Sequence, residues 1–248
     1  MKAMVLAAGL GTRLRPLTND KPKALVTVAG KTLLEITLLT LRSYGVDEAI
    51  VNVHHFADMV CEYLDENGSF GMHVEVSHEE ELLDTGGGLK KAAWFFLEDG
   101  TDEPFLLHNV DVLSTIDLDR LMRQHVEQGA LATLAVQERE TSRYLLFDGN
   151  GHLCGRRKGR DGEPEMARPG AHAQALAFAG IHVISPRLLT EMREEGAFSI
   201  IDAYLNLAAR GEKIAAFRAD EYYWRDLGRS ENVAEAERDL GSGICSEP

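Results

Sequence analysis

Four charged residues stand where a phosphate-binding site would need them. Arg13 and Lys23 lie in the stretch LAAGLGTRLRPLTNDKPKAL at residues 6–25, Asp111 follows the apolar run PFLLHNV, and Asp226 follows YYWR. Arginine and lysine side chains clamp phosphoryl oxygens. Carboxylates at two strand ends can share one Mg²⁺ whose other ligands are phosphate oxygens and water. The four residues therefore predict a phosphate site that holds a magnesium ion.

The loop that carries the two cations contains Gly9 and Gly11 directly after an apolar run. Glycines there let the backbone approach a ligand, and the exposed N–H groups of such a turn suit phosphate. Two known fingerprints do not match. The dinucleotide pattern needs a small residue where this chain has Leu14, and the P-loop needs a glycine at the position of Leu25. We expect a nucleotide in a loop of another type.

Each of these residues also has a structural alternative. A lone Asp most often caps a helix or a turn, and cations on a polar loop are commonly only solvated. The functional interpretation is favoured because the aspartates, the cations and the glycines occur together. The stretch DTGGG at residues 84–88 predicts a turn, and its glycines indicate either close approach to a ligand or helix–sheet packing.

Composition excludes several classes of partner. A formal net charge of −14 argues against nucleic acid, because binding a polyanion requires a basic surface. Cys61, Cys154 and Cys245 are odd in number and scattered, which indicates a reduced, cytoplasmic protein. No apolar run approaches the ~20 residues needed to span a membrane, and we interpret the start MKAMVLAAG as a buried strand.

Apolar strand-like runs alternate with helix-period segments in the first half of the chain, which predicts an α/β fold with a mainly parallel sheet covered on both faces. Expected strands occupy residues 2–8, 48–55, 72–77, 104–110, 131–138, 142–148 and 175–184, and expected helices occupy residues 33–45, 56–68, 89–97 and 118–129, the last capped by Asp117. The DGNG sequence at residues 148–151 predicts a hairpin turn. Residues 156–174 are polar and predict a mobile loop. We expect a single domain over residues 1–240 and a frayed tail at 241–248.

Longer motifs carry a family resemblance. The stretch LAAGLGTRLRPLTNDKPKALVTVAGKTLLE resembles the signature of sugar-1-phosphate nucleotidylyltransferases. The likeness continues through EEELLDTGGGLKKA, FLLHNVDVLSTID, FAGIHVISP, GAFSIIDAYL and WRDLGRSENVAEAE, so that it covers about residues 1–240. Among subfamilies the chain is most similar to N-acetylmuramate-1-phosphate uridylyltransferases and to short mannose-1-phosphate guanylyltransferase-like proteins.

The resemblance implies a fold and a reaction. The fold is a Rossmann-like three-layer nucleotidyltransferase fold with a smaller β-rich sugar-side region, whose nucleotide-side half covers about residues 1–115 and whose sugar-side half covers about 116–240. The reaction joins an NTP and a sugar 1-phosphate to give an NDP-sugar and pyrophosphate, with Mg²⁺ as cofactor. The two substrates are then the only implied partners, and the protein is a monomer or a homodimer.

The resemblance also implies roles for individual residues. Arg13 would hold the leaving pyrophosphate, Lys23 would contact the reacting phosphates, and Asp111 and Asp226 would bind the metal. The remaining expected site residues form three groups: a nucleotide loop of Leu6, Ala7, Ala8, Gly9, Gly11 and Thr12; a base-side group of Glu79, Thr85 and Gly86; and a sugar-side group of Asn109, Gly180 and Ser199.

Glu79 bears on the choice of base. A carboxylate only accepts hydrogen bonds, which suits the N–H groups of uracil or guanine and not the bare ring nitrogen of cytosine or adenine. We therefore expect UTP or GTP, with UTP first and N-acetylmuramate 1-phosphate or a related hexose 1-phosphate as its partner. Glu80 or Glu81 could take this role instead, and a salt bridge from Glu79 to Lys90 or Lys91 is the structural alternative.

Two departures from the family pattern concern the sugar. Val110 stands where relatives often have glycine, which could crowd the sugar or shift Asn109. The usual Glu-Lys-Pro segment is replaced by the polar residues 156–174. The alternatives are a mannose-1-phosphate guanylyltransferase, a phosphocholine-type cytidylyltransferase with an aromatic cage from Tyr222, Tyr223 and Trp224, and a silent NDP-sugar-sensing regulatory subunit. The last predicts loss of a charged site residue, and all four are present.

Overall fold

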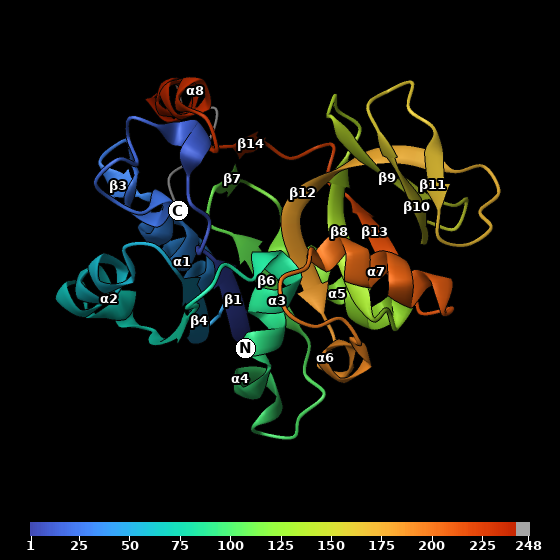
Figure 1. Ribbon diagram of the computed structural model, residues 1–248, viewed down its shortest axis with the longest axis horizontal. Helices are drawn as coiled ribbons and strands as arrows, with labels where there is room; N and C mark the ends of the chain where they lie inside the picture. Colours follow the sequence, from blue (N-terminus) through green and yellow to red (C-terminus); the bar gives the residue numbers. More distant parts are fainter. Residues whose placement is uncertain (242–248) are drawn as a thin grey trace.

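Strand β1 (Lys2–Leu6) lies inside the main sheet and delivers the glycine-containing loop at its carboxyl end. The computed structural model describes residues 1–241 (Figure 1). Within these residues the main sheet has ten strands, and parallel pairing joins β6, β1, β4 and β5 in that order. The mainly parallel α/β architecture predicted from the sequence is confirmed.

The remaining strands follow the chain order. They are β2 (Thr27–Val28), β3 (Lys31–Thr32), β4 (Glu48–Val53), β5 (His73–His78), β6 (Phe105–Asn109), β7 (Val112–Ser114), β8 (Ala132–Gln137), β9 (Arg143–Phe147), β10 (Leu153–Lys158), β11 (Pro164–Met166), β12 (Gln174–Ile184), β13 (Ile214–Arg218) and β14 (Trp224–Asp226). Strand β12 runs antiparallel to β6, β8 and β9, and Figure 1 shows it as a long curved strand that connects the parallel region to the β9–β11 side.

The helices cover the sheet. The α-helices are α1 (Leu33–Ser43), α2 (Ala57–Glu66), α3 (Asp84–Lys91), α4 (Ala93–Leu97), α5 (Leu118–Gln128), α6 (Arg187–Glu191), α7 (Ile200–Ala209) and α8 (Ser230–Gly241), with 3-10 turns at η1 (Thr12–Leu14), η2 (Lys23–Leu25) and η3 (Gly68–Gly71). As expected, Asp117 caps α5, accepting from the Arg120 backbone N–H at 2.8 Å. The frayed tail predicted for 241–248 lies outside the described residues, apart from Gly241, which ends α8.

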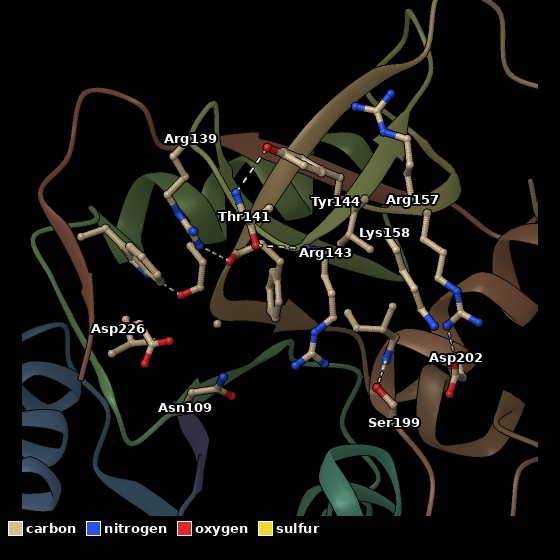
Figure 2. Close-up of a pocket in the computed structure, with 18 of the residues that line it drawn as sticks. Asn109, Arg139, Thr141, Arg143, Tyr144, Arg157, Lys158, Ser199, Asp202 and Asp226 are labelled. Carbon is tan, nitrogen blue, oxygen red and sulfur yellow. Dashed lines mark hydrogen bonds and ion pairs between the residues drawn. The ribbon is translucent and has the colours of Figure 1, made fainter. Parts of the chain in front are cut away.

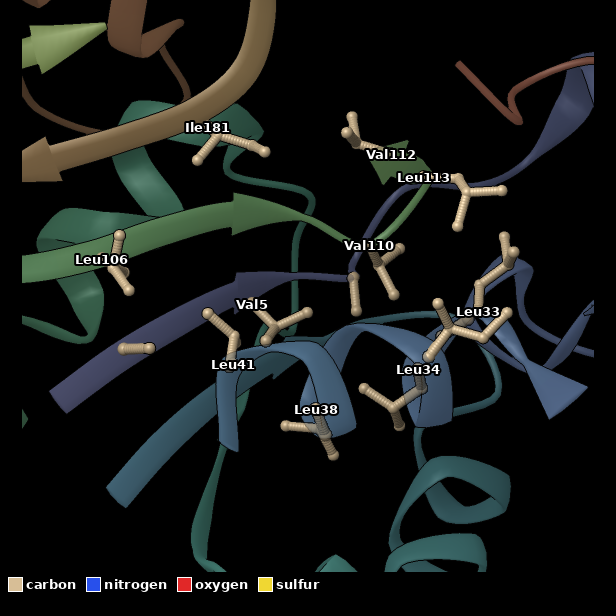
Figure 3. Packing of buried hydrophobic residues seen from close by; sticks show 14 of the residues in the cluster. Val5, Leu33, Leu34, Leu38, Leu41, Leu106, Val110, Val112, Leu113 and Ile181 are labelled. Carbon is tan, nitrogen blue, oxygen red and sulfur yellow. The ribbon is translucent and has the colours of Figure 1, made fainter. Parts of the chain in front are cut away.

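The pleat of the sheet separates the core into two clusters. Ala3 and Val5 of β1 pack with α1 on one face, whereas Met4 between them packs with α3 and α7 on the other. Figure 3 shows the first cluster, where Val110 points toward Leu34 and the α1 helix. Val110 is only 3% exposed. The expectation that it could crowd the sugar is therefore wrong, because its side chain belongs to the core.

Two segments differ from their predicted structure. Residues 156–174 were expected to form a mobile loop, but β10 continues to Lys158 and pairs with β11 through Gly155 and Met166. The DTGGG stretch was expected to form a turn, but it is the first part of α3. In both places tertiary pairing overrides a polar or glycine-rich local sequence. The hairpin turn at residues 148–151 is confirmed between β9 and β10.

Candidate active site

A cavity of about 850 Å³ opens at the carboxyl ends of β6 and β14, between the parallel strands and the β9–β11 region. Figure 2 shows Asp226 and Asn109 on one side of it and Lys158, Ser199 and Asp202 on the other. Six residues predicted from the sequence line it: Arg13, Asn109, Asp111, Gly180, Ser199 and Asp226. Its volume is in the range of small-molecule sites.

The charged residues converge around Gly228. A Cβ atom at Gly228 would lie 2.7 Å from Asp226 Oδ1, 2.8 Å from Arg13 Nη2 and 3.3 Å from Asp111 Oδ2. The Asp226 carboxylate is held by the Gly228 backbone N–H, which donates to it at 2.6 Å. Lys23 forms an ion pair with Asp111. Four residues from distant parts of the sequence thus form one charged cluster, as their chemistry predicted.

The carboxylates of Asp111 and Asp226 suit a divalent cation. Both approach the same small space at Gly228, and carboxylate oxygens are the ligands that hard cations prefer. No cluster of three or more His, Cys, Asp and Glu side chains occurs within residues 1–241 that could enclose a metal by itself. Two protein ligands leave the remaining coordination positions to phosphate oxygens and water, which is the usual arrangement for Mg²⁺.

The first turn of the nucleotide loop is fixed by a buried polar chain. The Ala7 backbone N–H donates to Asn52 Oδ1 at 2.7 Å, and Asn52 Nδ2 donates to Glu79 Oε1 at 2.7 Å. The second oxygen of Glu79 accepts from the Leu83 backbone N–H at 2.9 Å. Farther along the loop, Thr18 Oγ1 donates to the Gly11 carbonyl at 2.8 Å. These bonds set the backbone that was expected to receive phosphate.

Glu79 occupies a different environment from the one expected for it. Its side chain is 4% exposed, and both carboxylate oxygens accept hydrogen bonds from within the protein. Lys90 instead forms an ion pair with Glu195 at 3.6 Å, so the alternative of a Glu79–Lys90 bridge does not occur in the structure. In this arrangement Glu79 orients Asn52, and through it the nucleotide loop, while Glu80 and Glu81 are exposed.

The three glycines of α3 lie where neighbouring residues leave no room for a side chain. A Cβ at Gly86 would lie 2.3 Å from the Phe198 ring, one at Gly87 would lie 2.3 Å from the Gly196 carbonyl, and one at Gly88 would lie 2.7 Å from Glu79 Oε1. Backbone N–H groups of Gly86 and Gly87 both donate to Phe198 O. Close packing thus explains the glycines. Gly88 packs against Asn52 of β4, as the helix–sheet alternative predicts, whereas Gly86 and Gly87 pack against residues 196–198, which precede α7.

The start of α3 is joined to the start of α7. Thr85 Oγ1 accepts from the Ile200 backbone N–H at 2.9 Å, and Ser199 caps α7 by accepting from Ile201 N–H at 3.3 Å. Thr85 and Gly86, predicted on the base side, are therefore contacts between the two halves, and Ser199 faces the cavity (Figure 2). The junction therefore joins α3 to α7 across 115 residues of the sequence.

Gly180 brings β12 close to Asn109. Its φ of +76° is in the left-handed region, and a Cβ there would lie 2.9 Å from Asn109 Nδ2. The register of β12 against β8 shifts between Phe178 and His182, which places this irregularity at the cavity wall. Asn109 is also backed by His108, whose Nδ1 lies 2.8 Å from the Asn109 carbonyl oxygen. Burial lowers the pKa of His108 to about 4, so that it stays neutral near pH 7.

Several cavity residues were missed by sequence reasoning. Arg139 and Trp224 form part of the wall near Asp226, and Arg143, Arg156 and Lys158 come from β9 and β10. The signal that could have found the last three was the recurrence of cations at alternate positions of adjacent strands, which places them on one face. That signal was lost because residues 156–174 were interpreted as a loop.

The chain is similar to several known proteins. The family model described as nucleotidyl transferase matches residues 2–243. The N-acetylmuramate alpha-1-phosphate uridylyltransferase of Caulobacter vibrioides is 34% identical over 251 residues, and the match covers 96% of each chain. The UTP–glucose-1-phosphate uridylyltransferase of Synechocystis sp. and mannose-1-phosphate guanylyltransferase 1 of Arabidopsis thaliana are 29% and 28% identical. Those matches cover 92% of this chain but 60% and 62% of the longer relatives.

Solved structures share the fold. HddC from Yersinia pseudotuberculosis, solved in complex with GMP-PN, superimposes with a TM-score of 0.75 at 23% identity, covering 96% of this chain and 99% of that one. The inositol-1-phosphate CTP transferase from T. maritima gives a TM-score of 0.72 at 19% identity, covering 99% and 98%. Within residues 1–241 no helix combines the length and apolar character needed to cross a membrane. By its sequence, its fold and its relatives, the chain belongs to the nucleotidyl transferase family and is a sugar-1-phosphate nucleotidyltransferase.

Proposed function

We propose that this enzyme joins UTP and N-acetylmuramate 1-phosphate to give the UDP-sugar and pyrophosphate. The observation that carries the proposal is the end-to-end match, at 34% identity and 96% coverage of both chains, to a protein named for that reaction. The cavity supports it, because the charged cluster and the sugar-side residues Asn109, Gly180 and Ser199 line one space. A single domain, a cytoplasmic location and a monomeric or homodimeric state remain predictions.

In the proposed reaction, a phosphate oxygen of the sugar 1-phosphate attacks the α-phosphorus of UTP. The bond from that phosphorus to the bridging oxygen breaks, and pyrophosphate leaves. The nucleophile is already an anion near neutral pH, so the site requires no general base and acts by positioning and electrostatics. Arg13 holds the leaving pyrophosphate, and Lys23, released from Asp111 by the incoming phosphates, contacts the reacting groups.

A metal ion completes the charge balance. Enzymes of this family generally depend on a divalent ion, and we propose Mg²⁺ held by Asp111 and Asp226. When bound, it neutralises charge on the phosphates and orients them. The preference for UTP rests on the relative's name. Glu79 gives it no support, because that carboxylate accepts hydrogen bonds from Asn52 and Leu83 inside the protein.

A mannose-1-phosphate guanylyltransferase is the second candidate, since such proteins match 92% of this chain at 28% identity. A phosphocholine-type cytidylyltransferase is less well supported, because its aromatic cage would need side chains that already have partners. Trp224 lies under Arg139, Tyr223 donates to Asp239 at 2.7 Å, and Tyr222 stacks on Phe217.

Pyrophosphate release from a grid of the four NTPs and a set of sugar 1-phosphates tests the proposal. We expect the highest kcat/KM for UTP with N-acetylmuramate 1-phosphate. The Asp226→Asn variant serves as the inactive control that excludes a contaminating enzyme. A preference for GTP with mannose 1-phosphate would replace the proposal by the second candidate, and a preference for CTP would overturn both.

A further inference from the structure

Two cations face each other on the hairpin that forms the far wall of the cavity. In the antiparallel register of β9 and β10, Arg143 is directly opposite Lys158. Residues opposite each other share a face of the sheet, with Cβ atoms about 5 Å apart. Both line the cavity, and Figure 2 shows Arg143 directed into it, with Lys158 on the side of Ser199 and Asp202. The hairpin therefore presents two adjacent positive charges to the space where a substrate would lie.

These two cations are not neutralised by the protein. Within residues 1–241, neither Arg143 nor Lys158 takes part in an ion pair, although Arg156 on the same face does. Arg156 binds Glu165 through two hydrogen bonds at 2.7 and 3.0 Å, and it also forms an ion pair with Asp202. Arg156 thus engages Glu165 and Asp202, while Glu163, which also lines the cavity, forms no ion pair with Arg143 or Lys158. Like charges directly opposite each other destabilise a sheet. A bound anion between Arg143 and Lys158 would relieve this repulsion.

The proposed reaction places the reacting phosphate away from this pair. In that reaction the 1-phosphate lies at the cluster of Asp111, Asp226 and Arg13, whose side chains converge at Gly228. Figure 2 places Asp226 at one end of the cavity and Lys158 beyond Arg143 at the other. A sugar with its C1 phosphate at the first end would extend its ring substituents toward the second. The group that meets Arg143 and Lys158 is therefore on the sugar itself.

We propose that Arg143 and Lys158 form a subsite for a second anionic group on the sugar 1-phosphate, and that this group is a carboxylate. The proposal builds on the nucleotidyltransferase function above and names the substrate class that the sugar end selects. A guanidinium matches a carboxylate with two parallel hydrogen bonds, and an ammonium adds a point charge. N-acetylmuramate has such a carboxylate on its lactyl ether, whereas glucose and mannose do not.

Matched substrate pairs test the subsite. N-acetylglucosamine 1-phosphate and N-acetylmuramate 1-phosphate differ by the lactyl ether, and glucose 1-phosphate and glucuronate 1-phosphate differ by a carboxylate at C6. We expect a higher kcat/KM for the acidic member of at least one pair. Glucose 1,6-bisphosphate, included as a third probe, distinguishes a carboxylate subsite from a phosphate subsite. Higher kcat/KM for both neutral members, or for the bisphosphate above the carboxylates, would overturn the proposal.

Variants of Arg143 and Lys158 test whether these two residues cause the preference for acidic sugar 1-phosphates. Arg143→Gln and Lys158→Gln should each lower the acidic-to-neutral ratio of kcat/KM by roughly 10-fold, the effect of losing a hydrogen bond between charged groups. Arg160→Gln is the matched control, because Arg160 lies beyond β10 with its side chain 77% exposed and does not line the cavity. A ratio unchanged in both Arg143→Gln and Lys158→Gln would refute the assignment even if the acidic sugar were the better substrate.

The outcomes separate this proposal from the proposed function. If N-acetylmuramate 1-phosphate is inactive but glucuronate 1-phosphate exceeds glucose 1-phosphate in an Arg143-dependent manner, the named substrate fails and the anionic subsite stands. If N-acetylmuramate 1-phosphate is the best substrate but Arg143→Gln and Lys158→Gln lower its kcat/KM and that of N-acetylglucosamine 1-phosphate equally, the named substrate stands and the subsite fails.

Discussion

The guanidinium carbon of Arg139 lies 3.7 Å from the centre of the Trp224 ring. The Trp224 indole N–H donates to the Ala179 carbonyl at 2.7 Å, and Arg139 Nη2 donates to the Phe178 carbonyl at 2.7 Å. Both residues are thereby fixed against the irregular segment of β12 beside Gly180. Burial lowers the pKa of Arg139 and the charge of Asp226 opposes this. A rigid cation therefore stands next to Asp226, one of the two aspartates of the proposed metal site.

We expect Arg139→Lys to lower kcat/KM for the sugar 1-phosphate by roughly 10- to 100-fold, because a lysine cannot stack flat or keep the planar set of donors. The KM for the nucleotide should change much less. Trp224→Phe retains an aromatic platform and should give a smaller loss than Arg139→Lys. Steady-state kinetics with each substrate varied in turn make the comparison, and wild-type kinetics of Arg139→Lys would contradict a role in the site.

Removing the charge of Asp111 or Asp226 should lower kcat, whereas removing the charge of an ordinary surface carboxylate should not. Asp111→Asn and Asp226→Asn are each expected to lower kcat by on the order of 10²-fold or more, since each removes charge from the proposed metal site. Thermal unfolding should stay close to wild type, because asparagine keeps an acceptor oxygen. Asp119→Asn in the first turn of α5 is an exposed control. Undiminished kcat of either site variant at saturating Mg²⁺ would remove that residue from the site.

The parallel half of the fold could be predicted because its strands are buried on both faces. Residues Ala3, Met4 and Val5 are fully buried, so burial leaves a continuous apolar run that a single sequence reveals. Asp111 could be identified for a related reason, since a carboxylate just after such a strand stands at the edge where ligands bind. In these places the local pattern and the global fold agree. Asp226 instead ends β14, a half-buried strand that pairs antiparallel with β7, so its strand carries no such pattern.

The other features depend on partners that are distant in sequence. The carboxylate of Glu79 is buried because Asn52, 27 residues away, and the Leu83 N–H are there to satisfy it. The edge strand β11 contains Pro164 and is exposed, so no apolar pattern marks it. Arg143 and Lys158 become neighbours only through the hairpin register. None of these relations is visible in the spacing of residue types along the chain.

The Glu79→Gln variant tests whether Glu79 positions the loop through Asn52 or contacts the base directly. A glutamine amide has one acceptor oxygen, so it cannot accept from both Asn52 and Leu83, and one buried donor loses its partner at a cost of about 1–3 kcal/mol. The resulting shift of Asn52 should raise the KM for all four NTPs by a similar factor. Kinetics with each NTP make the test. A selective loss of UTP or GTP, with CTP and ATP unaffected, would instead support direct contact between Glu79 and the base.

Gly9 and Gly88 are expected to respond to alanine in opposite ways. No atom lies within 4 Å of a Cβ placed on Gly9, so Gly9→Ala should unfold at the wild-type temperature. Its methyl group would occupy space that the nucleotide phosphates approach, and the KM for the NTP should rise by roughly 10-fold or more. Gly88→Ala places a methyl group 2.7 Å from Asn52 Nδ2 and should cost about 1–3 kcal/mol of stability. An unchanged KM for Gly9→Ala would place the phosphates elsewhere.

Three buried histidines should make the protein sensitive to mild acid. Burial lowers the pKa of His108 and His125 to about 4 and that of His182 to about 3, from an ordinary value of 6.5. Between about pH 6 and 4.5 the unfolded chain binds these protons and the folded protein does not, so the free energy of unfolding rises with pH. The contribution is complete above pH 6.5 and is lost as the pH falls toward 4.

Each proton corresponds to about 1.4 kcal/mol per pH unit, so three histidines give a slope of about 4 kcal/mol per pH unit in that window. Urea unfolding at half-unit steps from pH 7.5 to 4.5 measures it, and points above pH 7, where all three are neutral in both states, supply the internal baseline. His125→Gln retains polar groups toward Thr133 and Ser185, which lie 2.9 and 3.0 Å from the imidazole nitrogens. It should reduce the slope by about one third, and a slope equal to wild type would mean that His125 is already protonated in the folded state or remains neutral in both states.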